Sequence, residues 1–73
     1  MCIREIKTGA KYRHFKGNEY IVLHVAKHSE TLEEYVVYQA LYGEREIWIR
    51  PLDMFLDTKE VEGKPVFRFE EIL

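Results

Sequence analysis

The chain has 73 residues, of which 47% are hydrophobic and 33% charged, a balance typical of a globular domain rather than a disordered one. This length suits one small domain, so residues 1–73 are expected to form a single unit with residues 1–8 as a flexible N-terminal segment. No apolar run approaches the roughly 20 residues that cross a bilayer, and no secretory stretch opens the chain. Because the lone Cys2 cannot form an internal disulfide, a cytoplasmic location without membrane contact is expected.

The net charge of −2 is unevenly distributed along the chain. Residues 1–28 hold six Lys and Arg against two Glu, net +4, whereas residues 29–73 hold five against eleven Asp and Glu, net −6. Nonspecific binding to nucleic acid depends on neutralising phosphates, so the acidic total argues against it. A basic strip in the first segment can still hold one phosphate or carboxylate. Folding can also mix the two segments and cancel the field.

Alternation and turn residues predict five short strands with one helical turn. The expected strands cover residues 11–15, 19–26, 34–42, 46–50 and 65–69. Turns are expected at residues 16–18, 43–45 and 62–64, where Gly tolerates positive φ. Residues 51–55 are expected to form a helical or 3-10 turn, since Pro51 suits a first helical position. This order predicts an all-β, mainly β fold, a small five-stranded SH3-like barrel whose closure leaves no exposed sheet edge.

The hairpin around Gly43 determines which side chains share a face. A three-residue loop pairs Ala40 with Trp48 and Tyr38 with Arg50, and it collects aliphatic side chains on the expected core face: Val37, Leu41, Ile47 and Ile49. A two-residue loop places Leu41 opposite Trp48 and Gln39 opposite Arg50, because a one-residue slip changes every neighbour. The three-residue loop is favoured since it separates aliphatic residues from aromatic and charged ones.

Several phrases of the sequence are characteristic when taken together. They are Tyr12-Arg13-His14-Phe15-Lys16-Gly17-Asn18, His28-Ser29-Glu30-Thr31-Leu32-Glu33, Val36-Val37-Tyr38-Gln39-Ala40-Leu41-Tyr42-Gly43 and Trp48-Ile49-Arg50-Pro51-Leu52-Asp53-Met54-Phe55. In these phrases, and over roughly residues 9–69, the chain resembles a bacterial family known as domain of unknown function 1653. The resemblance implies a single small domain in the bacterial cytoplasm. It brings no activity with it.

Ring-bearing and cationic residues interleave along the predicted strands. Arg offers a planar fork of donors for carboxylate or phosphate, and Trp and Tyr offer stacking surfaces with a polar edge. The candidate ligand-binding residues are Arg13, His14, His28, Ser29, Glu30, Tyr38, Trp48 and Arg50. Structural roles compete with this interpretation: Trp48 can close the end of a barrel, and Arg50 can pair with Glu30, Glu33 or Asp53.

The polar segment after the second predicted strand contains residues typical of chemistry. His24, His28 and Glu30 are possible metal ligands, but their spacing spans a strand and a loop and no further ligand is evident, so neither a metal site nor a cofactor is predicted. His28 and Ser29 are adjacent, and adjacent residues of an extended chain do not face each other as a nucleophile and its base do. Residues 31–34 match a capping box, which favours a structural role.

Three functions are consistent with these features. The favoured one is a non-catalytic recognition module whose aromatic and Arg-lined face binds a peptide, a nucleic-acid segment or a small anionic ligand. The first alternative is a small hydrolase acting on a phosphorylated or nucleotide-like substrate through His14, His28 and Glu30. The second is a homodimeric interaction subunit, since small cores gain stability from association and residues 69–73 offer apolar side chains.

Overall fold

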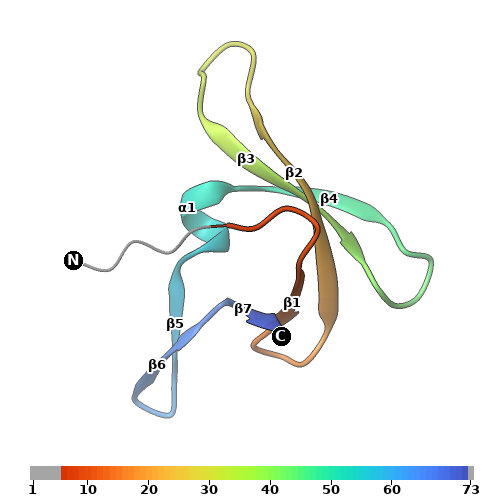
Figure 1. Ribbon diagram of the computed structural model, residues 1–73. Coiled ribbons are helices and arrows are strands. Elements are labelled where there is room, and N and C mark those ends of the chain that lie inside the picture. The colour runs from red at the N-terminus through yellow and green to blue at the C-terminus, as the bar shows by residue number, and fades with distance from the viewer. Residues whose placement is uncertain (1–5, 73) are drawn as a thin grey trace.

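The computed structural model describes residues 6–72 (Figure 1). They form β1 (Lys11–His14), β2 (Glu19–Lys27), β3 (Glu34–Ala40), β4 (Ile47–Pro51), α1 (Leu52–Phe55), β5 (Thr58–Val61), β6 (Lys64–Phe67) and β7 (Phe69–Ile72). The predicted mainly β class is therefore confirmed. Of the N-terminal segment expected to be flexible, residues 1–5 lie outside the described part. Ile6 packs against the core, and the Gly9 amide donates to the Val22 carbonyl at 2.7 Å.

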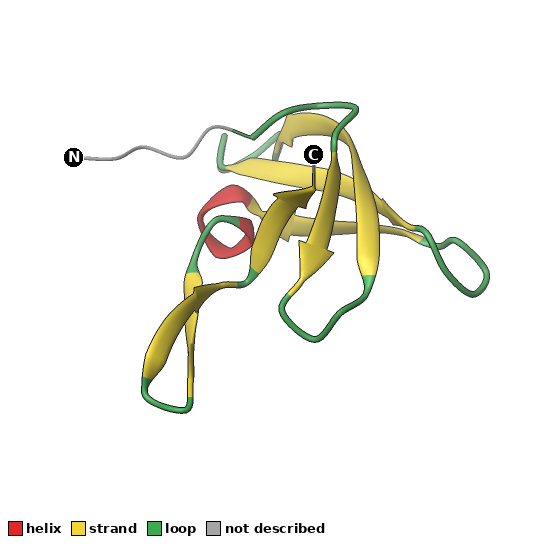
Figure 2. Cartoon of the chain, turned by 60° about the horizontal axis from the view of Figure 1, so that its bottom comes forward, coloured by secondary structure: helices red, strands yellow, loops and turns green. Residues whose placement is uncertain are grey.

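Five strands form one antiparallel sheet in the order β4-β3-β2-β1-β7, and β5 and β6 form a separate hairpin. In Figure 2 this hairpin projects away from the sheet. Within residues 6–72 the sheet is not closed into a barrel, because β4 and β7 each pair with one neighbour and not with each other. It is nevertheless strongly curled: the ring of Phe69 on β7 lies 5.6 Å from that of Tyr38 on β3, although β1 and β2 separate these strands.

Turn-forming residues act as the sequence predicts. The His14 amide donates to the Asn18 carbonyl at 2.7 Å, and Gly17 supplies the positive φ of 107° between them. Pro51 ends β4 and precedes α1. At the tip of the hairpin, Glu62 and Gly63 both have positive φ, as the central residues of a type I′ turn require.

The C-terminal third has more strands than predicted. The single strand expected over residues 65–69 is two strands, β6 and β7, because the chain turns at Arg68. β5 was not predicted at all. Its side chains are exposed along its whole length, so it lacks the apolar alternation that marks a half-buried strand.

The register of the β3–β4 hairpin differs from both predictions: Tyr38 pairs with Trp48, and residues 41–46 form the loop. The register differs because the chain stops pairing with the β4 segment after Ala40 and continues beside β2. The Leu41 amide donates to the carbonyl of Glu19 at 3.0 Å. The hydroxyls of Tyr42 and Tyr20 lie 2.7 Å apart. Burial, followed by this hydrogen bond, raises the pKa of Tyr20 to about 12.

The core is aromatic and lies on the inner face of the curled sheet. Its members are at most 5% exposed: Tyr12, Val22, Val36, Tyr38, Phe55 and Phe69. The rings of Phe55 and Phe69 stack at 4.1 Å, and Tyr38 meets both edge-on. The predicted aliphatic core face was wrong, because Ile47 and Ile49 are 59% and 66% exposed. Phe55 and Phe69, supplied by α1 and β7, cover the other face instead.

Candidate ligand-binding groove

A groove with a volume of about 840 Å³ lies between β1, the β1–β2 turn, the β5–β6 hairpin and β7. One wall is cationic and aromatic, and the other is largely apolar. The lining residues are Arg13, His14, Phe15, Lys16, Gly17, Thr58, Val61, Pro65, Val66, Phe67 and Glu70. Two of them, Arg13 and His14, belong to the residues that the sequence singled out.

The apolar wall comes from the hairpin. Val61 and Phe67 leave 40% and 43% of their surface exposed, and Phe15 across the groove leaves 36%. Exposed apolar side chains are unremarkable singly, but these face a common groove. A two-stranded hairpin is marginally stable by itself, so the wall depends on how its base is held.

Arg68 and Asp57 hold the base of the hairpin. The Arg68 guanidinium donates to both Asp57 carboxylate oxygens, at 2.6 and 3.0 Å, and the Arg68 amide donates to the Asp57 carbonyl at 3.0 Å. The side-chain hydrogen bonds from Arg68 lower the pKa of Asp57 against the opposing effect of its partial burial. The Phe15 amide also donates to the Arg68 carbonyl at 2.9 Å. Arg68 therefore joins the hairpin base to the β1–β2 turn.

The opposite wall concentrates positive charge around His14. The Lys16 amide donates to His14 Nδ1 at 3.2 Å, so Nδ1 is an acceptor and the neutral ring carries its proton on Nε2. Burial lowers the pKa of His14, and the positive charges of Arg50, Arg68 and Lys16 lower it further. Arg13 is partly neutralised by Glu19, whose carboxylate lies 3.1 Å away. His14 is thus an imidazole held neutral within a positive field.

The loop residues His28, Ser29 and Glu30 lie elsewhere. They follow the far end of β2, a nine-residue strand that separates its two ends by about 26 Å. His28 Nδ1 accepts hydrogen bonds from the Glu30 amide at 3.1 Å and the Thr31 amide at 3.3 Å, and Thr31 Oγ1 accepts from the Glu33 amide. These side chains cap a loop, not a helix. The structure does not bring His14 together with His28 and Glu30, so the hydrolase hypothesis loses its geometric basis.

Tyr38, Trp48 and Arg50 form a second group on the inner face, outside the lining of the groove. Tyr38 is buried, and its hydroxyl accepts a hydrogen bond from Arg50 Nε at 3.3 Å. The Arg50 guanidinium lies over the ring of Phe69, 5.6 Å from its centroid. Among residues 6–72, Arg50 forms no ion pair with Glu30, Glu33 or Asp53, the partners considered from the sequence. Trp48 is 48% exposed beside Tyr38.

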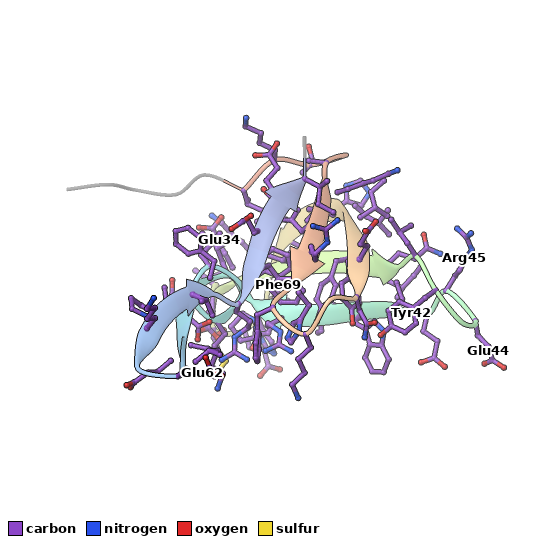
Figure 3. The ribbon with its side chains drawn as sticks, turned by 90° about the horizontal axis from the view of Figure 1, so that it is seen from below. Glu34, Tyr42, Glu44, Arg45, Glu62 and Phe69 are labelled. Carbon is purple, nitrogen blue, oxygen red and sulfur yellow. The ribbon has the colours of Figure 1, made fainter. Side chains whose placement is uncertain are left out.

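Sequence reasoning missed the hairpin wall of the groove, because the strand β5 was not predicted. The available signal was Glu62-Gly63, a dipeptide that suits a two-residue hairpin turn between Val61 and Lys64. Figure 3 shows Glu62 at the hairpin tip and Tyr42, Glu44 and Arg45 on the opposite side of the molecule, with Phe69 between them. Extending the hairpin from that turn would have paired Thr58 with Phe67, two residues that line the groove.

The described residues contain neither a metal-type cluster nor a membrane helix. Across residues 6–72, no three His, Cys, Asp or Glu side chains gather closely enough to hold a metal ion. The helix within the same range, α1, is far too short to cross a membrane.

The relationship to known proteins rests on both sequence and structure. The family model described as protein of unknown function (DUF1653) matches residues 10–71, so the chain belongs to this family. A crystal structure of a DUF1653 protein from Bordetella bronchiseptica is similar, with a TM-score of 0.81 and 33% identity over 93% of this chain and 88% of that one. No curated protein matches the chain. The family description assigns no function.

Proposed function

We propose that this DUF1653 protein is a non-catalytic recognition module whose groove binds a small ligand carrying both an anionic group and an apolar or aromatic group. The observation that carries the proposal is the pairing of an apolar hairpin wall with a cationic wall across one groove. Small-molecule sites are commonly apolar with a few polar groups that fix orientation. Lys16 and Arg13 would hold the anion, and Val61 and Phe67 would contact the apolar group.

The neutral state of His14 makes the proposed binding sensitive to pH. An anion near His14 would offset the charges of Arg50, Arg68 and Lys16 and thereby raise the His14 pKa from its lowered value. Binding would then take up a proton, so affinity should increase as the pH falls through about 6.5, the ordinary value from which the His14 pKa is lowered. With N-acetylphenylalanine, whose carboxylate stays ionised in this range, His14→Gln should abolish this pH dependence. An affinity that is equally pH-dependent in His14→Gln would show that another group titrates.

Nuclear magnetic resonance titration of the isotope-labelled protein provides the test. The probes are phenyl phosphate and N-acetylphenylalanine, compared with inorganic phosphate, acetate and benzyl alcohol, which each carry only one of the two groups. We expect the first two to shift amide signals from residues 13–17, 58–67 and 70, and the single-group compounds to bind at least about tenfold more weakly, equivalent to about 1.4 kcal/mol.

Matched variants separate recognition from general effects. Lys16→Gln and Val61→Ser should each weaken binding about tenfold, whereas Lys27→Gln and Met54→Ser, exposed positions outside the groove, should not. Shifts confined to another surface, or equal binding of inorganic phosphate and phenyl phosphate, would contradict the proposal.

We also propose that the fold is an open variant of the SH3-like barrel. The curl of the sheet supports this, because its two edge strands approach each other through Arg50 and Phe69.

A further inference from the structure

The strand β4 forms one edge of the sheet and exposes apolar side chains on both of its faces. Ile47, Trp48 and Ile49 leave 59%, 48% and 66% of their surfaces exposed, and among the described strands β4 pairs only with β3. Exposed apolar edge strands are templates for pairing with another strand, and proteins usually protect them with charge. The opposite edge, β7, has such protection in Glu70 and Glu71.

The backbone direction of β4 determines which residues can bond a further strand. The Ala40 amide donates to the Glu46 carbonyl at 3.0 Å, in the same register that pairs Tyr38 with Trp48. In an antiparallel pair, hydrogen-bonded residues alternate with residues whose polar groups point the other way. Glu46, Trp48 and Arg50 therefore bond β3, and the N–H and C=O groups of Ile47 and Ile49 point to the open edge.

We infer that β4 pairs antiparallel with β4 of a second copy of this chain, giving a twofold-symmetric dimer with one continuous sheet. In the register centred on Trp48, Ile47 lies opposite the partner's Ile49 and exchanges two backbone hydrogen bonds with it, and symmetry repeats the exchange. The same register places Glu46 opposite the partner's Arg50, twice. This charge complementarity is intrinsic to the sequence Glu46-Ile47-Trp48-Ile49-Arg50, in which Glu46 directly precedes β4.

Other registers that satisfy the backbone are less complementary. Centring on Ile49 places Ile47 opposite the partner's Pro51, which has no amide hydrogen to donate. Centring on Ile47 places Ile49 opposite the partner's Arg45, which has a positive φ of 55° and has left the strand conformation. The register centred on Trp48 is the one that confines its backbone hydrogen bonds to Ile47 and Ile49, both within β4, and pairs both charges.

The dimer would form independently of the groove. β4 and β7 are opposite edges of the sheet, and the groove is lined by β1, β7 and the hairpin. An interface built on one five-residue strand falls at the small end of protein interfaces, so association is expected to be weak.

Sedimentation velocity of the full chain from about 1 µM to about 1 mM tests the inference. We expect a concentration-dependent shift from monomer to dimer. Ile49→Lys should raise the dimer dissociation constant at least about tenfold, because it places an ammonium group against the partner's Ile47. Leu32→Lys, an equally exposed aliphatic position in the β2–β3 loop, should leave it unchanged. Circular dichroism of each variant verifies folding.

A charge-matched pair of variants tests the pairing of Glu46. Glu46→Lys should weaken the dimer by repelling the partner's Arg50, whereas Glu44→Lys makes the same change of charge outside the paired strand and should not. Equal weakening by both variants would overturn the proposed charge pairing.

Disulfide trapping tests the register. In a Cys2→Ser background, Trp48→Cys should form a dimer-linking disulfide, because the two copies of residue 48 face each other at a Cα separation of about 4.5 Å. Ile47→Cys should link poorly, since residue 47 faces residue 49. A protein that stays monomeric up to about 1 mM, or a dimer insensitive to Ile49→Lys, would overturn the inference.

Discussion

The two faces of the strands β2, β3 and β4 differ in burial although both are apolar. The inner face carries Val36 and Tyr38, which are almost fully buried, whereas the outer face carries Val37, Ile47 and Ile49, which are partly or largely exposed. Both faces are apolar enough to serve as a core. The difference shows that alternation determines which residues share a face, and that the elements beyond the sheet determine which face is covered.

Aromatic residues dominate the covered face for a reason of size. A domain of 73 residues can bury few side chains, and each aromatic ring buries more surface than an aliphatic side chain. Phe55 comes from a single turn of helix and Phe69 from the edge strand β7, yet together they cover Tyr12 and Tyr38. The inner face is thus completed by two short elements.

The largest expected effect is the removal of one of these covering rings. Phe69→Ala should destabilise the domain by about 3–5 kcal/mol, because a fully buried ring leaves a cavity. This is a large share of the stability of a small domain, so the variant should be mostly unfolded in urea titrations at 25 °C. Phe15→Ala, at a ring that is 36% exposed, serves as the matched control and should cost less than about 1 kcal/mol.

Adjacent valines compare the two faces directly. Val36→Ala should cost about 2 kcal/mol, since Val36 is 0% exposed, and Val37→Ala on the same strand should cost less than about 1 kcal/mol. The two variants share residue type and strand, so β-propensity largely cancels between them. Equal losses in thermal and urea unfolding would mean that the outer face is covered as well.

The Asp57–Arg68 pair should contribute a smaller, pH-dependent effect. Asp57→Asn should lower the free energy of unfolding by about 1 kcal/mol at pH 7, because the bidentate pair is partly exposed. Because the Asp57 pKa is lowered in the folded state, the unfolded chain takes up the proton first on acidification. The wild type should therefore lose this contribution as the pH falls below about 4.

Comparison with the other aspartate makes that prediction specific. In Asp57→Asn the free energy of unfolding should fall less steeply on acidification than in the wild type. In Asp53→Asn, a change on the exposed side of α1, it should fall as in the wild type. Parallel pH profiles for all three proteins would indicate that the pair does not stabilise the hairpin base.

The smallest effect is expected on the outer face. Ile49→Thr should change the free energy of unfolding by no more than about 0.5 kcal/mol, because the side chain is 66% exposed and Thr retains β-branching. The measurement should use protein at about 1 µM, where weak association contributes little. A loss above about 1 kcal/mol would show that Ile49 contacts more of its own chain than its exposure indicates.

Local chemistry was the part of the fold most readily predicted from the sequence. Gly17 and Pro51 act through backbone conformation alone, so the turn and the start of α1 could be placed without tertiary information. The hairpin register could not, because after Ala40 the chain continues along β2, where the Leu41 amide donates to the carbonyl of Glu19, a residue far away in sequence. The division of residues 64–72 into two strands depends likewise on the contact between Arg68 and Asp57.

The candidate site was predictable in part for the same reason. Arg13 and His14 sit next to a turn that the sequence identifies, and they line the groove. His28 has the right chemistry but lies at the other end of β2, where its ring caps a loop. A polar residue that lies near an aromatic residue in the sequence can occupy either end of a strand. Three separate regions of the structure, the groove, the β2–β3 loop and the inner face of β3 and β4, were therefore expected to form one binding face.

The pairing of β1 with β7 has a consequence for how the domain is made. Lys11 lies beside Ile72, and Tyr12 reaches its buried position only when Phe69 is present. Such contacts between residues distant in sequence must close a long loop before they stabilise anything, which slows folding. During synthesis, the aromatic face of β1 to β4 would lack the covering ring of Phe69 until residues 69–72 have been translated. The core of the domain then forms in one late step.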